Sequence, residues 1–207
     1  KVLDLANPDA SAFLLERLDA LVAEIGVDFI KWDHNRDLHA AVSPHPGRAS
    51  VHAQTAAFYA LLDALRERHP SLEIESCASG GARVDLGVLR RTQRVWASDS
   101  NDPVERQRIQ RWTGTLIPPE LVGSHVGPPI AETTHRAASL PFRMTTALFG
   151  HACIEWDITR ADEGEREALL EGDTALKTEV ERPLVGDTGG RMDGMDDGEW
   201  FYNPTNG

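Results

Sequence analysis

The sequence has few cysteines, no long apolar segment and no excess of positive charge, and each lack excludes a class of protein. Only Cys77 and Cys153 occur among 207 residues, too few for a disulfide framework. Apolar runs such as residues 147–149 are far shorter than the roughly 20 residues of a membrane-spanning helix. The net charge of −12 provides no positive field to attract nucleic acid or an anionic membrane. We therefore expect neither a nucleic-acid partner nor a membrane.

The N-terminus also lacks the charged, apolar and small-residue order of a secretory signal. A cytoplasmic location is the resulting expectation. The chain begins at Lys1 without a methionine and enters a strand-like run at once, so we expect further sequence upstream. With 41% hydrophobic residues, the chain has enough apolar material for the core of one domain or of part of one.

What the chain does contain is a regular alternation of strand-like and helix-like segments. Strands are predicted at residues 1–5, 27–32, 72–76, 94–97, 121–124 and 151–156, and helices at residues 8–25, 50–69, 103–112, 134–149 and 162–181. The first helix has Asn7 as its expected N-cap, Pro8 in its first position and Gly26 as its stop. Its apolar positions form one stripe, at residues 13, 14, 18, 21, 22 and 25. Such alternation predicts an α/β protein with a parallel sheet.

Polar residues of catalytic type stand just after nearly every predicted strand, at Asp33, Cys77, Asp99, His125 and Asp157. In a barrel the carboxyl ends of all strands converge on one site, whereas an open sheet concentrates its site at one crevice. This distribution favours a partial (β/α)8 TIM barrel with about six β/α units visible. About two strands, N-terminal ones among them, would then come from outside this chain.

The first carboxylate of interest is Asp33, in the run from Lys31 to Arg36. A buried carboxylate beside cations stays ionised at neutral pH, as a carboxylate nucleophile must. A structural ion pair at a strand end explains the same residues, because ion-pair networks also perturb charged groups.

The second is Asp99, three residues after Trp96. Desolvation by the tryptophan and repulsion from an ionised Asp33 would raise its pKa, as a general acid requires. The alternative is that an aspartate here caps the helix beginning at Pro103. We expect that role for Asp102 and not for Asp99, which lies closer to the strand.

The loop from Cys77 to Arg83 consists largely of small residues. Its glycines let the backbone approach a ligand, and Cys77 and the loop amides could bind ligand hydroxyl groups. A tight turn with Cys77 as a small buried residue remains the alternative. No metal is predicted, because HxH, HExxH and CxxC spacings are absent from the sequence.

Three further residues are assigned lesser roles. His125 is a candidate lining residue of the site. Asp157 is expected to orient other side chains or to cap the next turn, outside the catalytic set. Cys153 lies in an apolar strand and is expected in the core.

Four motifs occur together in one order: IKWDHNR, ESCASGGARVDLGVL, VWASDSND and LVGSHVGP. In this order they resemble the α-galactosidases of glycoside hydrolase family 36, from Lys1 to about Val185. The resemblance implies a catalytic (β/α)8 barrel over residues 1–185, and makes residues 186–207 a linker or the start of a C-terminal β-domain. It implies an enzyme without cofactor or metal that hydrolyses terminal α-linked galactose with retention, from galactosides such as melibiose or raffinose.

The same resemblance assigns roles to individual residues. Asp33 matches the nucleophile and Asp99 the acid/base. The implied substrate-binding residues are Lys31 and Cys77 as sugar contacts, Gly80 and Arg83, which shape the loop, and Trp96, which borders the pocket. In retaining enzymes the two carboxyl groups lie about 5 to 5.5 Å apart.

Two departures from the pattern of bacterial members are His34 in place of methionine and SDSND in place of SDNTD at residues 98–102. Both leave Asp33 and Asp99 unchanged and bear on substrate preference. Two other functions stay open: galactosyl transfer, as in raffinose-synthase-like relatives, and sugar binding by a module without activity. Assembly of the intact enzyme into a homo-oligomer is also left open.

Overall fold

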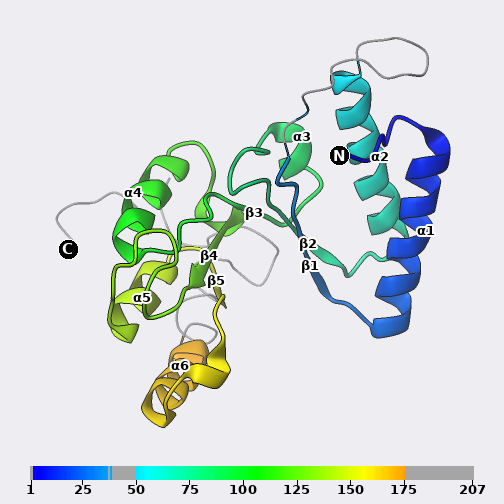
Figure 1. The fold of residues 1–207 in the computed structure, drawn as a ribbon. Helices are drawn as coiled ribbons and strands as arrows, with labels where there is room; N and C mark the ends of the chain where they lie inside the picture. The colour runs from blue at the N-terminus through cyan, green and yellow to red at the C-terminus, as the bar shows by residue number, and fades with distance from the viewer. Residues whose placement is uncertain (1, 37, 39–49, 176–207) are drawn as a thin grey trace, which may run out of the picture. The chain divides into compact units, whose positions relative to one another are not determined.

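The structure, a computed structural model, describes residues 2–36, 38 and 50–175 (Figure 1). The chain divides into two compact units, Lys1–Val95 and Trp96–Gly207. In both units the described elements alternate between short parallel strands and helices, as the sequence predicts. None of the helices described is long and apolar enough to cross a membrane.

The first unit holds two long helices and the first strands of the sheet. In chain order they are α1 (Pro8–Ile25), β1 (Phe29–Trp32), α2 (Val51–Arg68), β2 (Glu73–Ser76), α3 (Leu86–Leu89) and β3 (Arg94–Trp96), whose last residue already belongs to the second unit. β1 pairs in parallel with β2 from Phe29↔Glu73 to Trp32↔Ser76, and β2 pairs in parallel with the first residues of β3. The helices α1 and α2 pack side by side (Figure 1).

Local signals set the ends of α1 as predicted. The Asn7 side chain accepts a hydrogen bond from the Asp9 N–H, Pro8 is the first helical residue, and Gly26 ends the helix at φ 72°. This left-handed conformation suits glycine, which has no Cβ to clash. The predicted caps are therefore confirmed.

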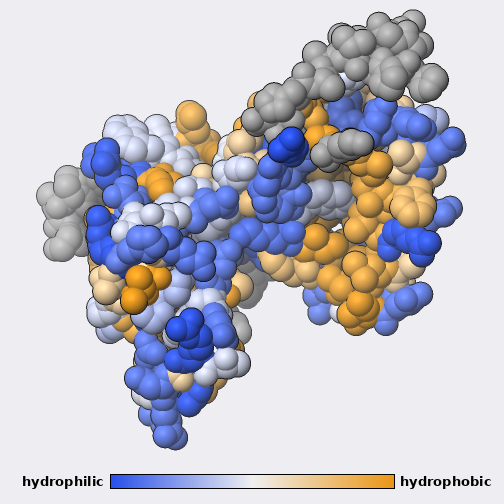
Figure 2. All heavy atoms as spheres, viewed as in Figure 1, coloured by the Kyte–Doolittle hydropathy of each residue, from blue (hydrophilic) through white to orange (hydrophobic). Residues whose placement is uncertain are grey.

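The predicted apolar stripe of α1 divides into two faces. Leu14 and Leu18 are half-buried and Val22 is buried. Phe13 and Ile25, by contrast, are 58% and 68% exposed. Figure 2 shows hydrophobic side chains gathered on the surface over α1. Spacing alone does not separate the two faces, because both fit an apolar helical period.

The core of the first unit lies between α2 and the strands. Its most buried apolar side chains are Phe58, Leu61, Leu62, Leu65, Leu72, Ile74, Val88 and Val95. The Trp32 ring meets the Phe58 ring edge-on, with 5.6 Å between centroids. This contact joins the end of β1 to the helix that follows it.

The strand predicted at residues 1–5 is wrong for the residues described there. Lys1 lies outside the described residues, and the next residues are irregular before a turn at Leu5. The Gln54 side chain takes the backbone groups that a neighbouring strand would bind: its Oε1 accepts from the Leu5 N–H at 2.8 Å and its Nε2 donates to the Leu3 carbonyl at 2.9 Å. A side-chain amide thus satisfies this backbone without a sheet partner.

The second unit continues the alternation. Its elements are α4 (Pro103–Thr113), η1 (Pro119–Leu121), β4 (Val122–Val126), α5 (Leu140–Ala147), β5 (His151–Ile154), η2 (Ile158–Arg160) and α6 (Glu163–Ala175). β4 and β5 pair in parallel from Gly123↔His151 to Val126↔Ile154. Val126, Leu140, Ala147 and Leu169 form a buried apolar cluster that joins β4, α5 and α6.

Two predictions for this unit need correction. The helix predicted from residue 134 begins at Leu140, because Pro141 suits only the first turn and residues 132–134 form a turn that the antiparallel bridge Ile130↔Ala137 closes. Cys153 is exposed instead of buried: the first two residues of β5 are half-buried and the last two, Cys153 and Ile154, are exposed. Of the helix predicted at residues 162–181, the last six residues lie outside the described part.

Candidate active site

The carboxyl ends of β1 and β2 lie side by side and carry the first part of the site. The Cys77 N–H donates to the Trp32 carbonyl at 3.0 Å, which extends the pairing of the two strands to their last residues. Asp33 follows β1 and Cys77 follows β2, so the strand pairing itself brings these two side chains together.

Asp33 is exposed and accepts three hydrogen bonds. The donors are the His34 N–H at 2.8 Å, Asn35 Nδ2 at 2.5 Å and the Cys77 side chain. Partial burial raises the pKa of Asp33, but these hydrogen bonds and the charge of Lys31 outweigh it, so the pKa lies below its ordinary value. The sequence suggested a buried carboxylate beside cations, but Asp33 is exposed, and hydrogen bonds contribute more than the charge of Lys31 to keeping it ionised at neutral pH.

Asn35 is a site residue that the sequence interpretation missed. Its Nδ2 donates to Asp33, while its Oδ1 accepts from the Ser79 N–H at 2.8 Å. One amide thus links the carboxylate to the loop after β2. An asparagine two residues after Asp33 carries both a donor and an acceptor on one short amide, and that signal could have identified it.

The loop after β2 is a tight turn with a buried cysteine at its start. Ser79 and Gly80 both have left-handed backbones, at φ 49° and 77°, and the Ala78 N–H donates to the Gly80 carbonyl at 2.9 Å. Gly80 adopts this conformation without strain, whereas the Cβ of Ser79 makes it unfavourable there. Cys77 is 1% exposed and its side chain is hydrogen-bonded to Asp33, so this residue is both buried and in contact with the carboxylate.

Arg83 fixes the base of this loop. Its guanidinium donates to the Trp32 and Cys77 carbonyls, at 3.0 Å each, and lies 4.2 Å from the centroid of the Phe58 ring. Burial lowers the pKa of Arg83, and nearby groups such as Cys77 and Asp33 oppose that effect. These donors are directed at the ends of both strands, which holds the loop in position relative to Asp33.

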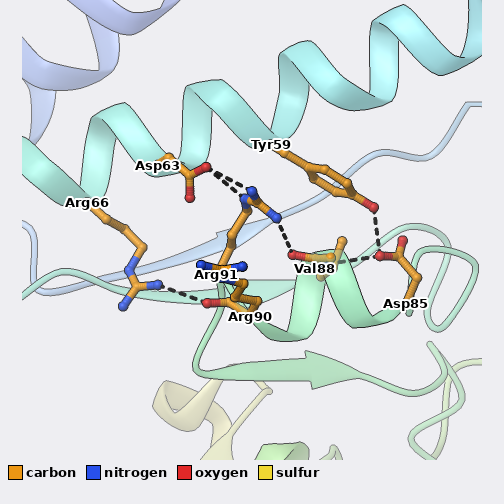
Figure 3. Close-up of polar contacts among 8 residues, drawn as sticks. Tyr59, Asp63, Arg66, Asp85, Val88, Arg90 and Arg91 are labelled. Carbon is orange, nitrogen blue, oxygen red and sulfur yellow. Dashed lines mark hydrogen bonds and ion pairs between the residues drawn. The ribbon is translucent and has the colours of Figure 1, made fainter.

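The far end of the loop is held by contacts between α2 and α3 (Figure 3). Asp85 caps α3 and accepts from the Tyr59 hydroxyl at 2.6 Å, while Arg91 pairs with Asp63 at 2.9 Å. Burial and, to a smaller extent, the hydrogen bond and charge of the Asp85 carboxylate raise the pKa of Tyr59 to about 12. Tyr59 packs closely over Gly87, where an added Cβ would lie 2.7 Å from the ring. The loop between Cys77 and Asp85 is thus anchored at both ends.

In the second unit, Asp99 lies exposed in a bend three residues after the end of β3. Trp96 is 1% exposed and stacks on His125, with 4.3 Å between ring centroids. The Arg106 guanidinium lies 4.1 Å from the Trp96 ring. The strand end before Asp99 is therefore packed on aromatic and cationic side chains.

Asp102 has the capping role predicted for it. It is buried, accepts from the Val104 N–H at 2.9 Å, and binds Thr134 and Arg136 at 2.7 Å each. Burial raises the pKa of Asp102, but the bonds from Thr134, Val104 and Arg136 outweigh it and lower the pKa overall. Asp102 is thus used for structure, which distinguishes it from Asp99.

Asp157 likewise has a local role, since it caps η2 through the Thr159 N–H. The described residues contain no group of three or more His, Cys, Asp or Glu side chains that could hold a metal ion.

Comparison with known proteins identifies what this arrangement resembles. The melibiase family model matches residues 1–185. The α-galactosidase of Escherichia coli is 50% identical over 164 residues, which cover 79% of this chain and 23% of the relative. Alpha-galactosidase 2 of Hypocrea jecorina is 35% identical over 185 residues, covering 89% of this chain and 24% of the relative. The chain thus spans about a quarter of the length of these relatives.

Solved structures agree in fold. The GH36 α-galactosidase AgaA of Geobacillus stearothermophilus superposes with a TM-score of 0.81 at 30% identity, covering 88% of this chain and 26% of AgaA. Variants of AgaA have been solved with raffinose and with stachyose. The prediction of a partial (β/α)8 barrel is confirmed, with five strands among the described residues instead of six.

Proposed function

Because the chain belongs to the melibiase family, we propose that it carries the catalytic pair of an α-galactosidase that releases terminal α-linked galactose with retention. The observation that carries the proposal is Asp33, held ionised at the carboxyl end of β1 by Asn35, Cys77 and a backbone N–H. Two carboxylates, one nucleophile and one acid/base, are what retaining glycosidases use.

The reaction proceeds in two displacements. An Asp33 oxygen attacks the anomeric carbon and the bond to the leaving oxygen breaks, while Asp99 gives its proton to that oxygen. Asp99 then takes a proton from water, whose oxygen attacks the same carbon and releases Asp33. Each attack inverts the anomeric carbon, so the product retains the configuration of the substrate.

Other residues support these two steps. Lys31 and Cys77 act on Asp33 itself and are the proposed contacts with galactose hydroxyls. Gly80 and Arg83 hold the loop beside them, and Trp96 supports the strand before Asp99. Raffinose and stachyose bound to AgaA variants support galacto-oligosaccharides as the substrate class.

The test is a pair of substitutions in the full-length protein. Asp33→Ala should abolish turnover of both raffinose and an aryl α-galactoside. Asp28→Ala is the matched control, because Asp28 is an exposed aspartate just before the same strand, at its opposite end. Near-normal turnover by Asp33→Ala would remove Asp33 from the role of nucleophile.

The acid/base assignment has its own signature. Asp99→Ala should lose turnover of raffinose, whose leaving group needs a proton, by about 10² to 10⁴-fold. Hydrolysis of α-galactosyl fluoride, whose leaving group needs little protonation, should fall far less at the galactosylation step. Equal losses on both substrates would contradict an acid role for Asp99.

A further inference from the structure

Arg106 is a buried cation one helical turn into α4, and its guanidinium binds two backbone carbonyls. It is 2% exposed, and it donates to the Ser98 carbonyl and to the Gly123 carbonyl, at 3.0 Å each. Its guanidinium also lies against the ring of Trp96. Burying a charge is costly unless it is hydrogen-bonded, so this arrangement needs all of these contacts.

The Ser98 carbonyl belongs to the peptide unit that leads directly into Asp99. A hydrogen bond to that carbonyl fixes the plane of the peptide, and with it the direction in which the Asp99 backbone starts. The second carbonyl belongs to Gly123 in β4, so the anchor is a strand of the sheet. Only a planar guanidinium offers two separated donors and a flat face for the tryptophan.

The other end of the same segment is fixed independently. Asp102 is buried and bound by Thr134 and Arg136. Asp99 is therefore an exposed carboxylate on a short segment that is held on both sides by polar contacts of buried side chains, Arg106 and Asp102. A general acid must lie within hydrogen-bond reach of the leaving oxygen, so this rigidity bears directly on catalysis.

We propose that Arg106 is the positioning residue for Asp99, through its hydrogen bond to the Ser98 carbonyl. The inference rests on the proposed acid/base role of Asp99. Loss of the guanidinium frees the peptide before Asp99, and a displacement of about 1 Å of a catalytic group costs on the order of 10²-fold in rate. The loss falls on substrates that need the proton from Asp99.

The experiment uses Arg106→Lys and Arg106→Met in the full-length protein. Arg108→Met is the matched control, an exposed arginine on the same helix. The quantity measured is kcat/KM for α-galactosyl fluoride divided by kcat/KM for raffinose. This ratio does not depend on the fraction of protein that is folded, so a partly unfolded variant still gives an answer.

The ratio should rise by about 10²-fold for Arg106→Met, should rise less for Arg106→Lys, and should stay unchanged for Arg108→Met. An unchanged ratio for both Arg106 variants would overturn the inference, even if their activity fell, because a purely structural role lowers both rates equally. Asp99→Ala is measured alongside. If its ratio also stays unchanged, the proposed function of Asp99 fails; if its ratio rises while those of the Arg106 variants do not, only the positioning role fails.

Discussion

Replacing Gly127 with alanine should displace the segment that carries Asp99. Gly127 directly follows β4, and an added Cβ would lie 2.8 Å from Asn101 Cβ and 3.1 Å from the Asn101 carbonyl oxygen. Carbon atoms in contact prefer about 3.5 to 4.0 Å, so one partner must move by roughly 0.7 Å or more. The Gly127 carbonyl accepts from buried Arg143 at 2.8 Å, which prevents Gly127 from retreating. Asn101 must therefore move, two residues from Asp99.

The expected magnitude follows from this displacement. Overpacking of this kind costs about 1 to 3 kcal/mol of stability. A shift approaching 1 Å at Asp99 costs up to about 10²-fold in turnover of raffinose. Turnover of α-galactosyl fluoride should fall much less, because it needs little help from an acid.

The assay measures both rates, together with the midpoint of thermal unfolding, in the full-length protein. Gly150→Ala is the control for overpacking, because its Cβ would lie 2.7 Å from the Val122 carbonyl oxygen. Gly150 directly precedes β5 and Val122 is the first residue of β4, so this clash lies at the opposite end of β4 from Gly127. It should lower the midpoint comparably and leave the ratio of the two rates unchanged. A normal ratio in Gly127→Ala, with the stability lost, would refute the reasoning.

Two further predictions concern the first unit. Asn35→Ala removes a hydrogen-bond donor that lowers the pKa of Asp33, so this pKa should rise. The acidic limb of the profile of kcat/KM against pH should therefore move to higher pH. An acidic limb that did not move would count against the Asn35–Asp33 contact. Gly87→Ala should cost about 1 to 3 kcal/mol in denaturant unfolding because its Cβ would meet Tyr59 at 2.7 Å. In a Tyr59→Ala background, Gly87→Ala should be neutral or should stabilise the protein by up to about 1 kcal/mol, because alanine favours the helix. If Gly87→Ala still destabilised the protein in that background, the Tyr59 ring would not be the cause.

Features determined by neighbouring residues in the chain could be predicted from the sequence. Asn7 and Gly26 delimit α1, and Asp102 caps α4, because each acts on backbone groups only a few residues away. The ends of β1 and β2 could also be placed, and with them Asp33 and Cys77, because a loop of polar or small residues begins directly after each strand. Family motifs then supplied roles that these positions alone left open.

Features that depend on distant partners could not be predicted. Gln54 replaces a strand partner for Leu5 and Leu3, which lie 49 and 51 positions away in the chain. The turn before α5 is closed by a bridge, Ile130↔Ala137, that no local pattern reveals. The hydrogen bonds of Arg106 span 8 and 17 residues. In the sequence it is one of many charged residues on an amphipathic helix, and only packing shows that its guanidinium is buried.

The proposed reaction depends on a covalent bond between Asp33 and galactose. The most direct measurement uses a fluorinated α-galactosyl fluoride that forms the intermediate faster than it hydrolyses, followed by proteolysis and mass spectrometry of the full-length protein. We expect the sugar mass on the peptide that contains Asp33, and no adduct on Asp33→Ala. A sugar attached to a different carboxylate, or turnover of the probe by Asp33→Ala, would contradict the proposed reaction.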